Sequence, residues 1–305
     1  MIRVNALIVT FKRKELLAKV IEGVISQSYK LNKIIIIDNN SNDGTQELVS
    51  SIQAVSEIKI DYFNTGANLG GAGGFCYGFE KAMQEKFDYL WIMDDDLLPS
   101  VDCLEVMLAN ANESKITQPI RYNLDGSCAE YSPTKFDLSS PFIMRPKKET
   151  VLDKMSMPNI KAEEEIAIDG IPFEGPLIPY QIIEKVGLPN KNFFIFYDDL
   201  DYAIRTKKAG FEIVCNTKAV AKRLLVNNQS TDLRSWKGYF MLRNFFHIHR
   251  VHGQNTIVRI RPLLIALLYI SKELLFFRKD TALVCWHALL DAFSKDFNLR
   301  RKYIP

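Results

Sequence analysis

The chain has 305 residues, of which 47% are hydrophobic and 25% are charged, and its formal net charge is +3. This composition is typical of a soluble globular protein of one large α/β domain or one domain with an appendage. The five cysteines are odd in number and form no CxxC pair, which argues against a disulfide framework or a zinc site and favours a reducing, cytoplasmic compartment.

The first 95 residues alternate between strand-like and helix-like segments. Apolar runs at 3–11, 33–38, 59–63 and 89–93 predict strands. Amphipathic patterns predict helices between them, at 16–25, 45–52 and 75–83. This alternation predicts a parallel sheet with helices on both faces.

The rest of the chain divides into three parts. Between 120 and 165 the pattern is lost, and we interpret this stretch as an insertion or a mobile loop region. A helix is expected from Asp198 to Gly210, where the glycine suits a helix C-terminus. From 226 onward the chain has a helical pattern. We therefore expect one domain at 1–225 and a helical module at 226–305.

The charge is unevenly distributed along the chain. Residues 206–305 contain 18 Lys or Arg and 6 Asp or Glu, whereas residues 1–205 have an acidic excess. In the C-terminal part the basic residues alternate with large apolar residues at helical spacing, which suits an anionic membrane surface better than nucleic acid. Its longest apolar run, 262–270, is too short to span a bilayer, and the N-terminus has no pattern of a secretory signal.

Polar residues follow each predicted strand, where ligands of parallel sheets bind. Asp94, Asp95 and Asp96 close the fourth strand, and alternation places the first and third on one face. Two carboxylates about 4 Å apart repel by roughly 4 kcal/mol at an intermediate dielectric, and a divalent cation would remove that cost. The alternatives are a solvated acidic loop or helix capping.

Three further patterns carry candidate chemistry. The glycine-rich stretch ANLGGAGGF, residues 67–75, precedes a predicted helix start, where bare backbone N–H groups suit a diphosphate; a simple hinge is the alternative. Asp38 is placed to bind a nucleotide base or ribose, or to form an Asx turn. Asp199 suits a general base, although acidic residues also favour a helix N-terminus, and Asp201 with Arg205 forms a structural pair.

Taken together, LIVTFKR, IIIIDNNSNDGT, NLGGAGGF, MDDD and FFIFYDDLDYAIRTKKAGFEI resemble the ordered motifs of the family 2 glycosyltransferases, over residues 3–216. The resemblance implies the GT-A fold, a Rossmann-like α/β fold with a mainly parallel sheet flanked by helices. It also implies inverting transfer of a sugar from a nucleotide-sugar donor to a saccharide acceptor.

The resemblance also implies roles for individual residues. Asp94 and Asp96 would bind Mn²⁺ or Mg²⁺, and Asp199 would be the catalytic base. Acceptor binding would fall to Glu174, Gly175 and Asp198. Donor binding would fall to Thr10, Asp38, Asn40, Asn68, Gly70, Gly71, Gly73 and Asp95.

NLGGAGGF and YFMLRN, residues 239–244, resemble galactofuranosyltransferases and related bacterial rhamnosyltransferases. This resemblance favours UDP-galactofuranose as donor, with dTDP-L-rhamnose as the alternative, and a polyprenyl-diphosphate-linked acceptor in bacterial surface polysaccharide synthesis on the inner face of the plasma membrane. A non-catalytic scaffold that binds a sugar nucleotide is the alternative to an enzyme. The oligomeric state is left open, and a homo-oligomer is one of the alternatives.

The sequence departs from the family pattern at two places. Asp198 stands where Glu is commoner, and the neighbourhood AVAKRLL lacks the metal-binding histidine of many relatives. Either the metal keeps only aspartate and diphosphate ligands, or one of three later histidines substitutes: His247, His249 or His252.

Overall fold

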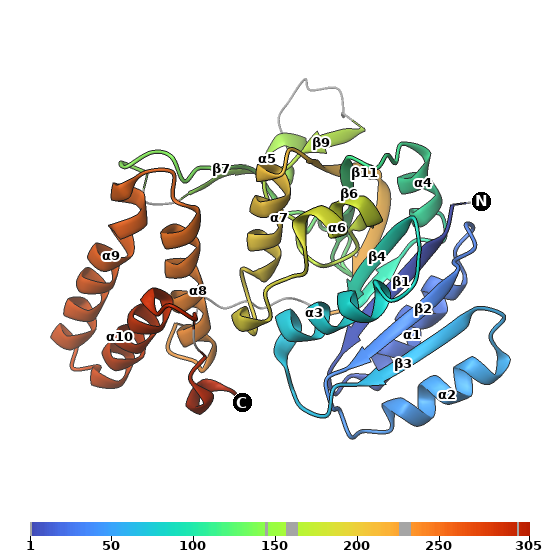
Figure 1. The fold of residues 1–305 in the computed structure, drawn as a ribbon, viewed down its shortest axis with the longest axis horizontal. Coiled ribbons are helices and arrows are strands. Elements are labelled where there is room, and N and C mark those ends of the chain that lie inside the picture. The colour runs from blue at the N-terminus through green and yellow to red at the C-terminus, as the bar shows by residue number, and fades with distance from the viewer. Residues whose placement is uncertain (1, 144–145, 157–163, 226–232, 298) are drawn as a thin grey trace.

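A computed structural model describes residues 2–143, 146–156, 164–225, 233–297 and 299–305. It contains an α/β domain, built on a sheet of nine strands, and beside it a module of three long helices (Figure 1). The expected boundary at 226 falls outside the described residues.

The N-terminal part of the sheet is parallel, as the alternating pattern predicts, and its strands lie in the order β3-β2-β1-β4. Its elements are β1 (Val4–Thr10), α1 (Lys14–Ile25), β2 (Lys33–Asp38), α2 (Thr45–Val55), β3 (Lys59–Asn64), α3 (Gly70–Ala82) and β4 (Tyr89–Asp94).

The sheet continues through β10-β6-β11-β5, with β9 paired to β11. Among the described strands of this part, only β6 and β11 pair in parallel, so the whole sheet is mixed. The elements are β5 (Leu97–Pro99), α4 (Cys103–Ala109), β6 (Lys115–Tyr122), β9 (Glu165–Ala167), β10 (Leu177–Pro179), α6 (Tyr180–Val186), η1 (Lys191–Phe193), α7 (Asp198–Lys208) and β11 (Glu212–Arg223).

Helices cover both faces of the sheet because alternate strand residues point to opposite sides. In β1, Leu7 and Val9 pack in one core with residues of α3, α6 and α7. Ala6 and Ile8 pack in the other core with residues of α1, α2 and α4. The prediction of a sheet with helices on both faces is therefore confirmed.

The glycine-rich stretch differs from the prediction. Helix α3 begins at Gly70 rather than near Phe75, so the glycines form its first turns. Tertiary packing explains this start, since a Cβ on Gly74 would lie 2.6 Å from Cγ1 of Val9 in β1. Low helix propensity is overridden here by the close approach of helix and sheet.

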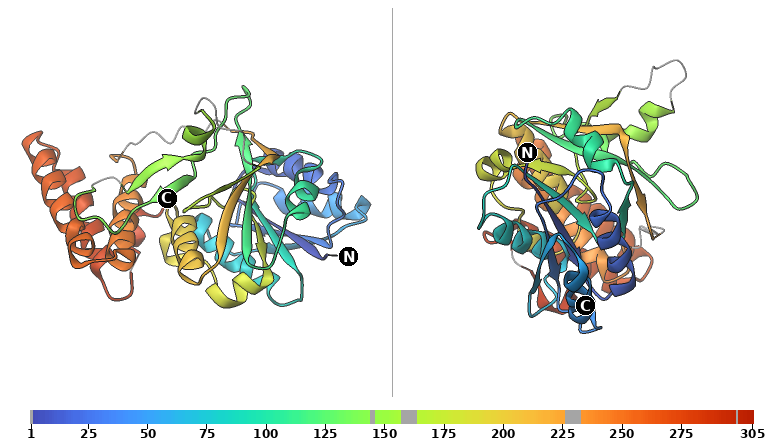
Figure 2. Two further views of the ribbon diagram at one scale, coloured as in Figure 1. Left: turned by 90° about the horizontal axis from the view of Figure 1, so that it is seen from above. Right: turned by 90° about the vertical axis from the view of Figure 1, so that its right-hand side faces the viewer.

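Residues 120–165 also contain more regular structure than expected. They include a hairpin of β7 (Pro133–Phe136) and β8 (Lys147–Thr150), followed by α5 (Val151–Met155), whose Thr150 forms a capping box with Asp153. In Figures 1 and 2 this hairpin runs from the α/β domain toward the helical module.

The C-terminal module consists of α8 (Lys237–His252), α9 (Thr256–Leu275) and α10 (Lys279–Phe293), with η2 (Arg301–Tyr303) near the end of the chain. Its own core includes Tyr239, Phe240 and Cys285. In the described parts of the chain, no helix has the length and apolar character needed to cross a membrane.

Candidate active site

The register of the sheet brings the predicted site residues to one edge. Thr10 lies opposite Asp38, which is itself opposite Asn64, and Val9 lies opposite Asp94. The ends of four strands, β1, β2, β3 and β4, therefore meet at the carboxyl edge, as the sequence predicts.

Asp95 organises the end of β1 from within the protein. Its buried carboxylate accepts hydrogen bonds from the Thr10 hydroxyl at 2.7 Å and the Phe11 amide at 3.3 Å. Arg13 bridges this carboxylate, at 3.1 Å, and that of Asp96, at 3.2 Å. Thr10 and Asp95 were both expected to bind the nucleotide-sugar donor, and their side chains are hydrogen-bonded to one another.

Asp94 and Asp96 are acidic residues whose pKa values are raised although Arg13 forms an ion pair with Asp96. Burial, and then the charge of Asp96, raises the pKa of Asp94 well above its usual value. Burial, and then the charge of Asp95, raises the pKa of Asp96 to about 6, although Arg13 acts in the opposite direction. Such electrostatics favour an added cation.

The carboxylates of Asp94 and Asp96 fit a divalent ion as ligands, because Mn²⁺ and Mg²⁺ prefer carboxylate and other oxygen ligands. Among the residues that the structure describes, no group of three or more His, Cys, Asp or Glu side chains is arranged to hold a metal. Asp94 and Asp96 are the residues that would hold one, and their role stays a prediction.

Asp38 forms a local turn with Ser41, which agrees with the Asx turn expected as the alternative to nucleotide binding. Its Oδ1 accepts hydrogen bonds from the Ser41 amide at 2.9 Å and hydroxyl at 2.5 Å, and its Oδ2 accepts one from the Tyr62 hydroxyl at 2.6 Å. Both carboxylate oxygens are engaged in a buried position. A role in holding a nucleotide stays a prediction.

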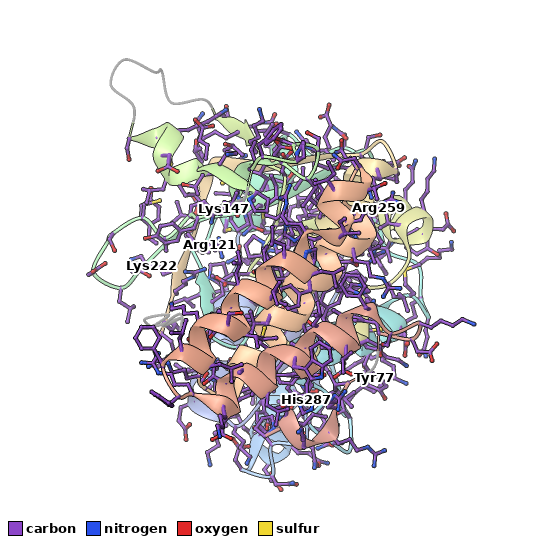
Figure 3. All side chains as sticks on the ribbon, turned by 90° about the vertical axis from the view of Figure 1, so that its left-hand side faces the viewer. Tyr77, Arg121, Lys147, Lys222, Arg259 and His287 are labelled. Atoms are coloured by element: carbon purple, nitrogen blue, oxygen red, sulfur yellow. The ribbon has the colours of Figure 1, made fainter. Side chains whose placement is uncertain are left out.

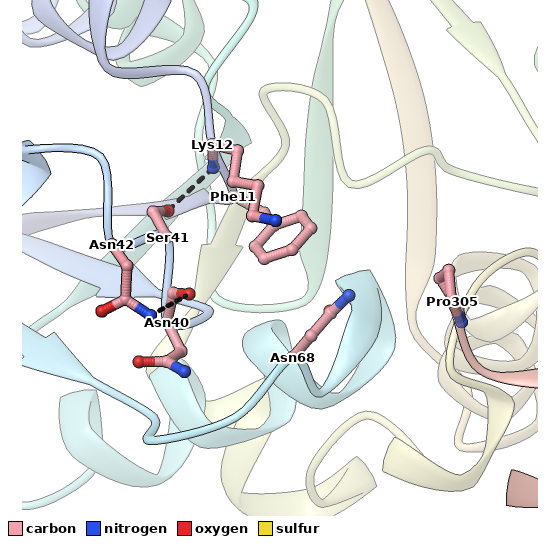
Figure 4. Close-up of a pocket in the computed structure, with 7 residues that line it drawn as sticks. All are labelled: Phe11, Lys12, Asn40, Ser41, Asn42, Asn68 and Pro305. Carbon is pink, nitrogen blue, oxygen red and sulfur yellow. Dashed lines mark hydrogen bonds between the residues drawn. The ribbon is translucent and has the colours of Figure 1, made fainter.

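A cavity of about 410 Å³ opens beside this turn (Figure 4). Two expected donor-binding residues, Asn40 and Asn68, line it. Five lining residues were not anticipated: Phe11, Lys12, Ser41, Asn42 and Pro305. Lys12 belongs to the same LIVTFKR motif as Thr10, so a basic residue directly after the first strand was the available signal.

The glycines at the start of α3 serve different purposes. Gly70 has a φ of +70°, and a Cβ there would overlap the backbone of Phe194. A Cβ on Gly73 would lie 2.6 Å from Cβ of Leu69. Only Gly71 of the three has no neighbour within 4 Å of an added Cβ, so it presents open backbone. The Asn68 side chain accepts a hydrogen bond from the Gly70 amide at 2.9 Å.

Glu174 is held by two arginines that sequence reasoning missed. Arg121 and Arg223 each donate to its carboxylate at 2.7 Å. Burial raises the pKa of Glu174, but the two guanidinium groups outweigh it and lower the pKa overall. Gly175 has a φ of +99°, and its carbonyl accepts a hydrogen bond from the Trp91 indole at 2.9 Å. Acceptor binding by Glu174 and Gly175 stays a prediction.

Asp198 and Asp199 begin α7 as expected, with Asp201 in the same first turn. Burial, and then Asp199, raises the pKa of Asp198 well above its usual value. Burial raises the pKa of Asp199 to about 6; the Leu200 amide opposes this shift, and the charge of Glu174 adds to it. The charge of Glu174 also raises the pKa of Asp94, so it acts on both acidic groups.

The three histidines of α8 have partners within the helical module and α7. His247 stacks on Phe297 with 3.5 Å between ring centroids, and the His249 ring lies 2.9 Å from the Phe245 carbonyl. His252 contacts Asp201 at 2.7 Å. These contacts are those of packing and structural hydrogen bonding.

Comparison with known proteins identifies the family. Residues 6–161 match the model of glycosyl transferase family 2. The chain is 27% identical over 215 residues to galactofuranosyltransferase GlfT1 of Mycolicibacterium smegmatis, covering 68% of this chain and 66% of that protein. The Mycobacterium tuberculosis GlfT1 is also 27% identical, over 216 residues, or 68% of this chain and 65% of its own length. The chain thus spans slightly less than two thirds of these relatives.

A Campylobacter jejuni GalNAc(5)-diNAcBac-PP-undecaprenol beta-1,3-glucosyltransferase is 33% identical over 112 residues, which are 36% of this chain and 35% of that protein. Among solved structures, GalNAc-T7 with UDP, GalNAc and Mn²⁺ aligns with a TM-score of 0.60 at 15% identity, covering 81% of this chain and 51% of that one. Pyrobaculum calidifontis mannosyltransferase PcManGT aligns with a TM-score of 0.55 at 13% identity, covering 97% and 77%. The fold is that of these GT-A glycosyltransferases. The chain belongs to glycosyl transferase family 2.

Proposed function

We propose that this protein is an inverting glycosyltransferase that moves galactofuranose from UDP-galactofuranose to a lipid-linked saccharide in bacterial surface polysaccharide synthesis. The observation that supports the transfer chemistry is that burial and the charge of Glu174 raise the pKa of Asp199 and of both Asp94 and Asp96. The GlfT1 relatives, at 27% identity, favour the galactofuranose donor.

Asp199 is suited to take a proton from the acceptor hydroxyl. As that proton moves to its carboxylate, the acceptor oxygen bonds to the anomeric carbon and the bond from that carbon to the diphosphate oxygen breaks. The electron pair of the broken bond leaves with the nucleoside diphosphate. A pKa of about 6 suits a base near neutral pH, since it is mostly ionised yet still basic.

Asp94 and Asp96 would hold a Mn²⁺ or Mg²⁺ ion, which neutralises the charge that develops on the leaving diphosphate. The cavity beside Asn40 and Asn68 is large enough for part of a nucleotide and lies at the ends of β1 and β2. The open backbone at Gly71 is the proposed contact for the diphosphate.

A donor screen tests this function. Purified protein with Mn²⁺ and a saccharide acceptor is expected to release UDP from UDP-galactofuranose faster than dTDP from dTDP-L-rhamnose. Asp199→Asn and Asp96→Asn should each lower turnover at least about a hundredfold, a typical loss for a general base or metal ligand. A preference for dTDP-L-rhamnose would identify that nucleotide sugar as the donor in place of UDP-galactofuranose. Binding of a nucleotide sugar without turnover would support a non-catalytic scaffold instead.

We also propose that the helical module lies on an anionic membrane surface. Large apolar side chains on α9 are exposed at three- and four-residue spacing: Ile260, Leu263, Leu264, Leu267 and Leu268. Beyond its end Phe277 is 90% exposed, and Lys272, Lys279 and Arg259 add positive charge. Figure 3 looks onto this module, with Arg259 and His287 labelled. Exposed apolar rows with basic neighbours are typical of interfacial helices.

A further inference from the structure

The segment of residues 192–197, which leads into α7, has an unusual backbone conformation. Phe194, Phe196 and Tyr197 have positive φ values of 66°, 65° and 67°. Bulky aromatic residues rarely adopt this region, and such conformations persist only where the surrounding structure imposes them. The segment ends one residue before Asp198, so its conformation sets where the first turn of α7 begins.

Five consecutive carbonyls of this segment accept hydrogen bonds from outside it. Asn244 on α8 donates from its amide nitrogen to the carbonyls of Phe193, Ile195 and Phe196, at 2.7 to 3.0 Å. Arg243 donates to the carbonyl of Asn192 at 2.9 Å, and the amide of Ala72 donates to that of Phe194 at 3.0 Å.

The chemistry of these contacts fixes the orientation of the Asn244 amide. Its Oδ1 accepts a hydrogen bond from the Arg243 guanidinium at 2.8 Å, which can only donate. Its nitrogen is the only end of the amide that can bond to three carbonyls. Both side chains are completely buried, and Arg243 lies 3.7 Å from the ring centroid of Phe297.

The same helix contacts α7 beyond Asp199. Lys208 lies 3.0 Å from Nδ1 of His252, and because an ammonium group only donates, that nitrogen accepts. Nε2 of His252 therefore carries the proton and donates to Asp201 at 2.7 Å. Helix α8 thus binds the chain on both sides of the proposed base.

We propose that Asn244 and Arg243 are positioning residues for Asp199, and that α8 is a structural part of the active site. They hold residues 192–196 in the strained conformation from which α7 starts. This inference rests on the proposed role of Asp199 as the base, but the positioning itself can be measured without activity.

Asn244→Asp is the direct test, because it keeps the acceptor for Arg243 and replaces the donor by a carboxylate that repels the three carbonyls. Hydrogen–deuterium exchange of the peptide spanning 193–203 is expected to become at least tenfold faster. In the donor assay kcat should fall at least about tenfold, since small displacements of a reacting group are costly, while the Kd for UDP stays within about threefold.

Asn255→Ala is the matched control. Asn255 caps α9 by accepting a hydrogen bond from the Val258 amide at 3.0 Å, so its loss weakens the same module without touching 192–196. This variant should keep both kcat and the exchange of 193–203 within about threefold of the wild type. Equal effects of the two variants would overturn the proposal, as would unchanged exchange in Asn244→Asp.

Two further measurements cover the case in which Asn244→Asp does not fold. Arg243→Lys keeps a cation but loses the forked guanidinium, and it should also accelerate exchange across 193–203. In the wild type, rising urea should remove the protection of 193–203 together with that of α8. Protection that outlasts that of α8 would contradict the proposal. If exchange is faster in these variants but the wild type shows no turnover, only the proposed function is contradicted.

Discussion

At the scale of single residues, the balance of charges around Asp199 sets its basicity. Burial and Glu174 raise its pKa, and Arg121 lowers it. Because Glu174 also binds Arg121, it reduces the effect of the cation that would make Asp199 a weaker base. Asp198, directly beside it, has a raised pKa as well.

This balance predicts a pH dependence. A base with a pKa of about 6 is protonated below that pH, so kcat should fall about tenfold per pH unit below 6 and stay level above 7. Glu174→Gln removes a negative charge near Asp199, and it also removes one of the two carboxylates that bind Arg121, the other being Glu130. Both changes should move the inflection to lower pH. Activity that stays level down to pH 4.5 in the wild type would refute the assignment.

At the scale of elements, α3 shows why a glycine-rich stretch can be a helix. Its glycines let the helix approach β1 and the backbone of Phe194, and Gly71 alone of Gly70, Gly71, Gly73 and Gly74 would leave an added Cβ in open space. Packing and ligand binding therefore make separate demands on neighbouring positions of one helix.

Two substitutions in α3 separate these demands. Gly71→Val should raise the KM for the donor at least tenfold and leave Tm within about 2 °C, because the added side chain enters open space. Gly74→Ala should cost about 1–3 kcal/mol of unfolding free energy, because its Cβ meets Val9 in the core. Thermal unfolding and donor kinetics check both. A large loss of Tm in Gly71→Val would contradict this division.

Sequence patterns predicted the elements that carry a local signal. Apolar runs marked the parallel strands, and Thr10, Asp38 and Asp94 at their ends indicated the edge where the site lies. The start of α3 was missed because glycine has low helix propensity and only contacts with distant residues explain it.

Features that depend on distant partners could not be predicted. Arg121 in β6 and Arg223 in β11 contact Glu174, which lies between β9 and β10, and no local spacing in the sequence indicates these contacts. The hairpin of β7 and β8 was missed for a similar reason. Its connecting residues are held by the helical module, where Arg261 donates to the carbonyls of Ser140 and Ile143.

At the scale of the whole molecule, the two parts differ in what they expose. The helical module carries the exposed apolar row of α9 together with basic side chains, and the α/β domain carries the acidic site. This difference is the basis for the proposed orientation, in which α9 lies on a membrane.

Liposome co-sedimentation tests this orientation. The protein should bind vesicles containing phosphatidylglycerol at low salt and release them at high salt, because the attraction between charges is screened. Leu264→Glu with Leu268→Glu should abolish binding. Val55→Glu on α2, where Val55 is 85% exposed, is the matched control and should bind normally. Absence of wild-type binding at low salt would refute the proposal. If the wild type instead forms a concentration-dependent dimer that Leu264→Glu disrupts, the exposed apolar row of α9 is an interface with a second copy of the chain.

The hydrogen bond from the Ala72 amide to the Phe194 carbonyl joins the donor side of the site to the segment that leads into α7. A ligand that shifts the start of α3 would therefore also change the free energy of placing Asp199. Thermodynamic reciprocity then requires that an acceptor bound near Asp199 alters the affinity for the donor by the same factor. On this basis a single backbone contact would couple the affinities for the two substrates.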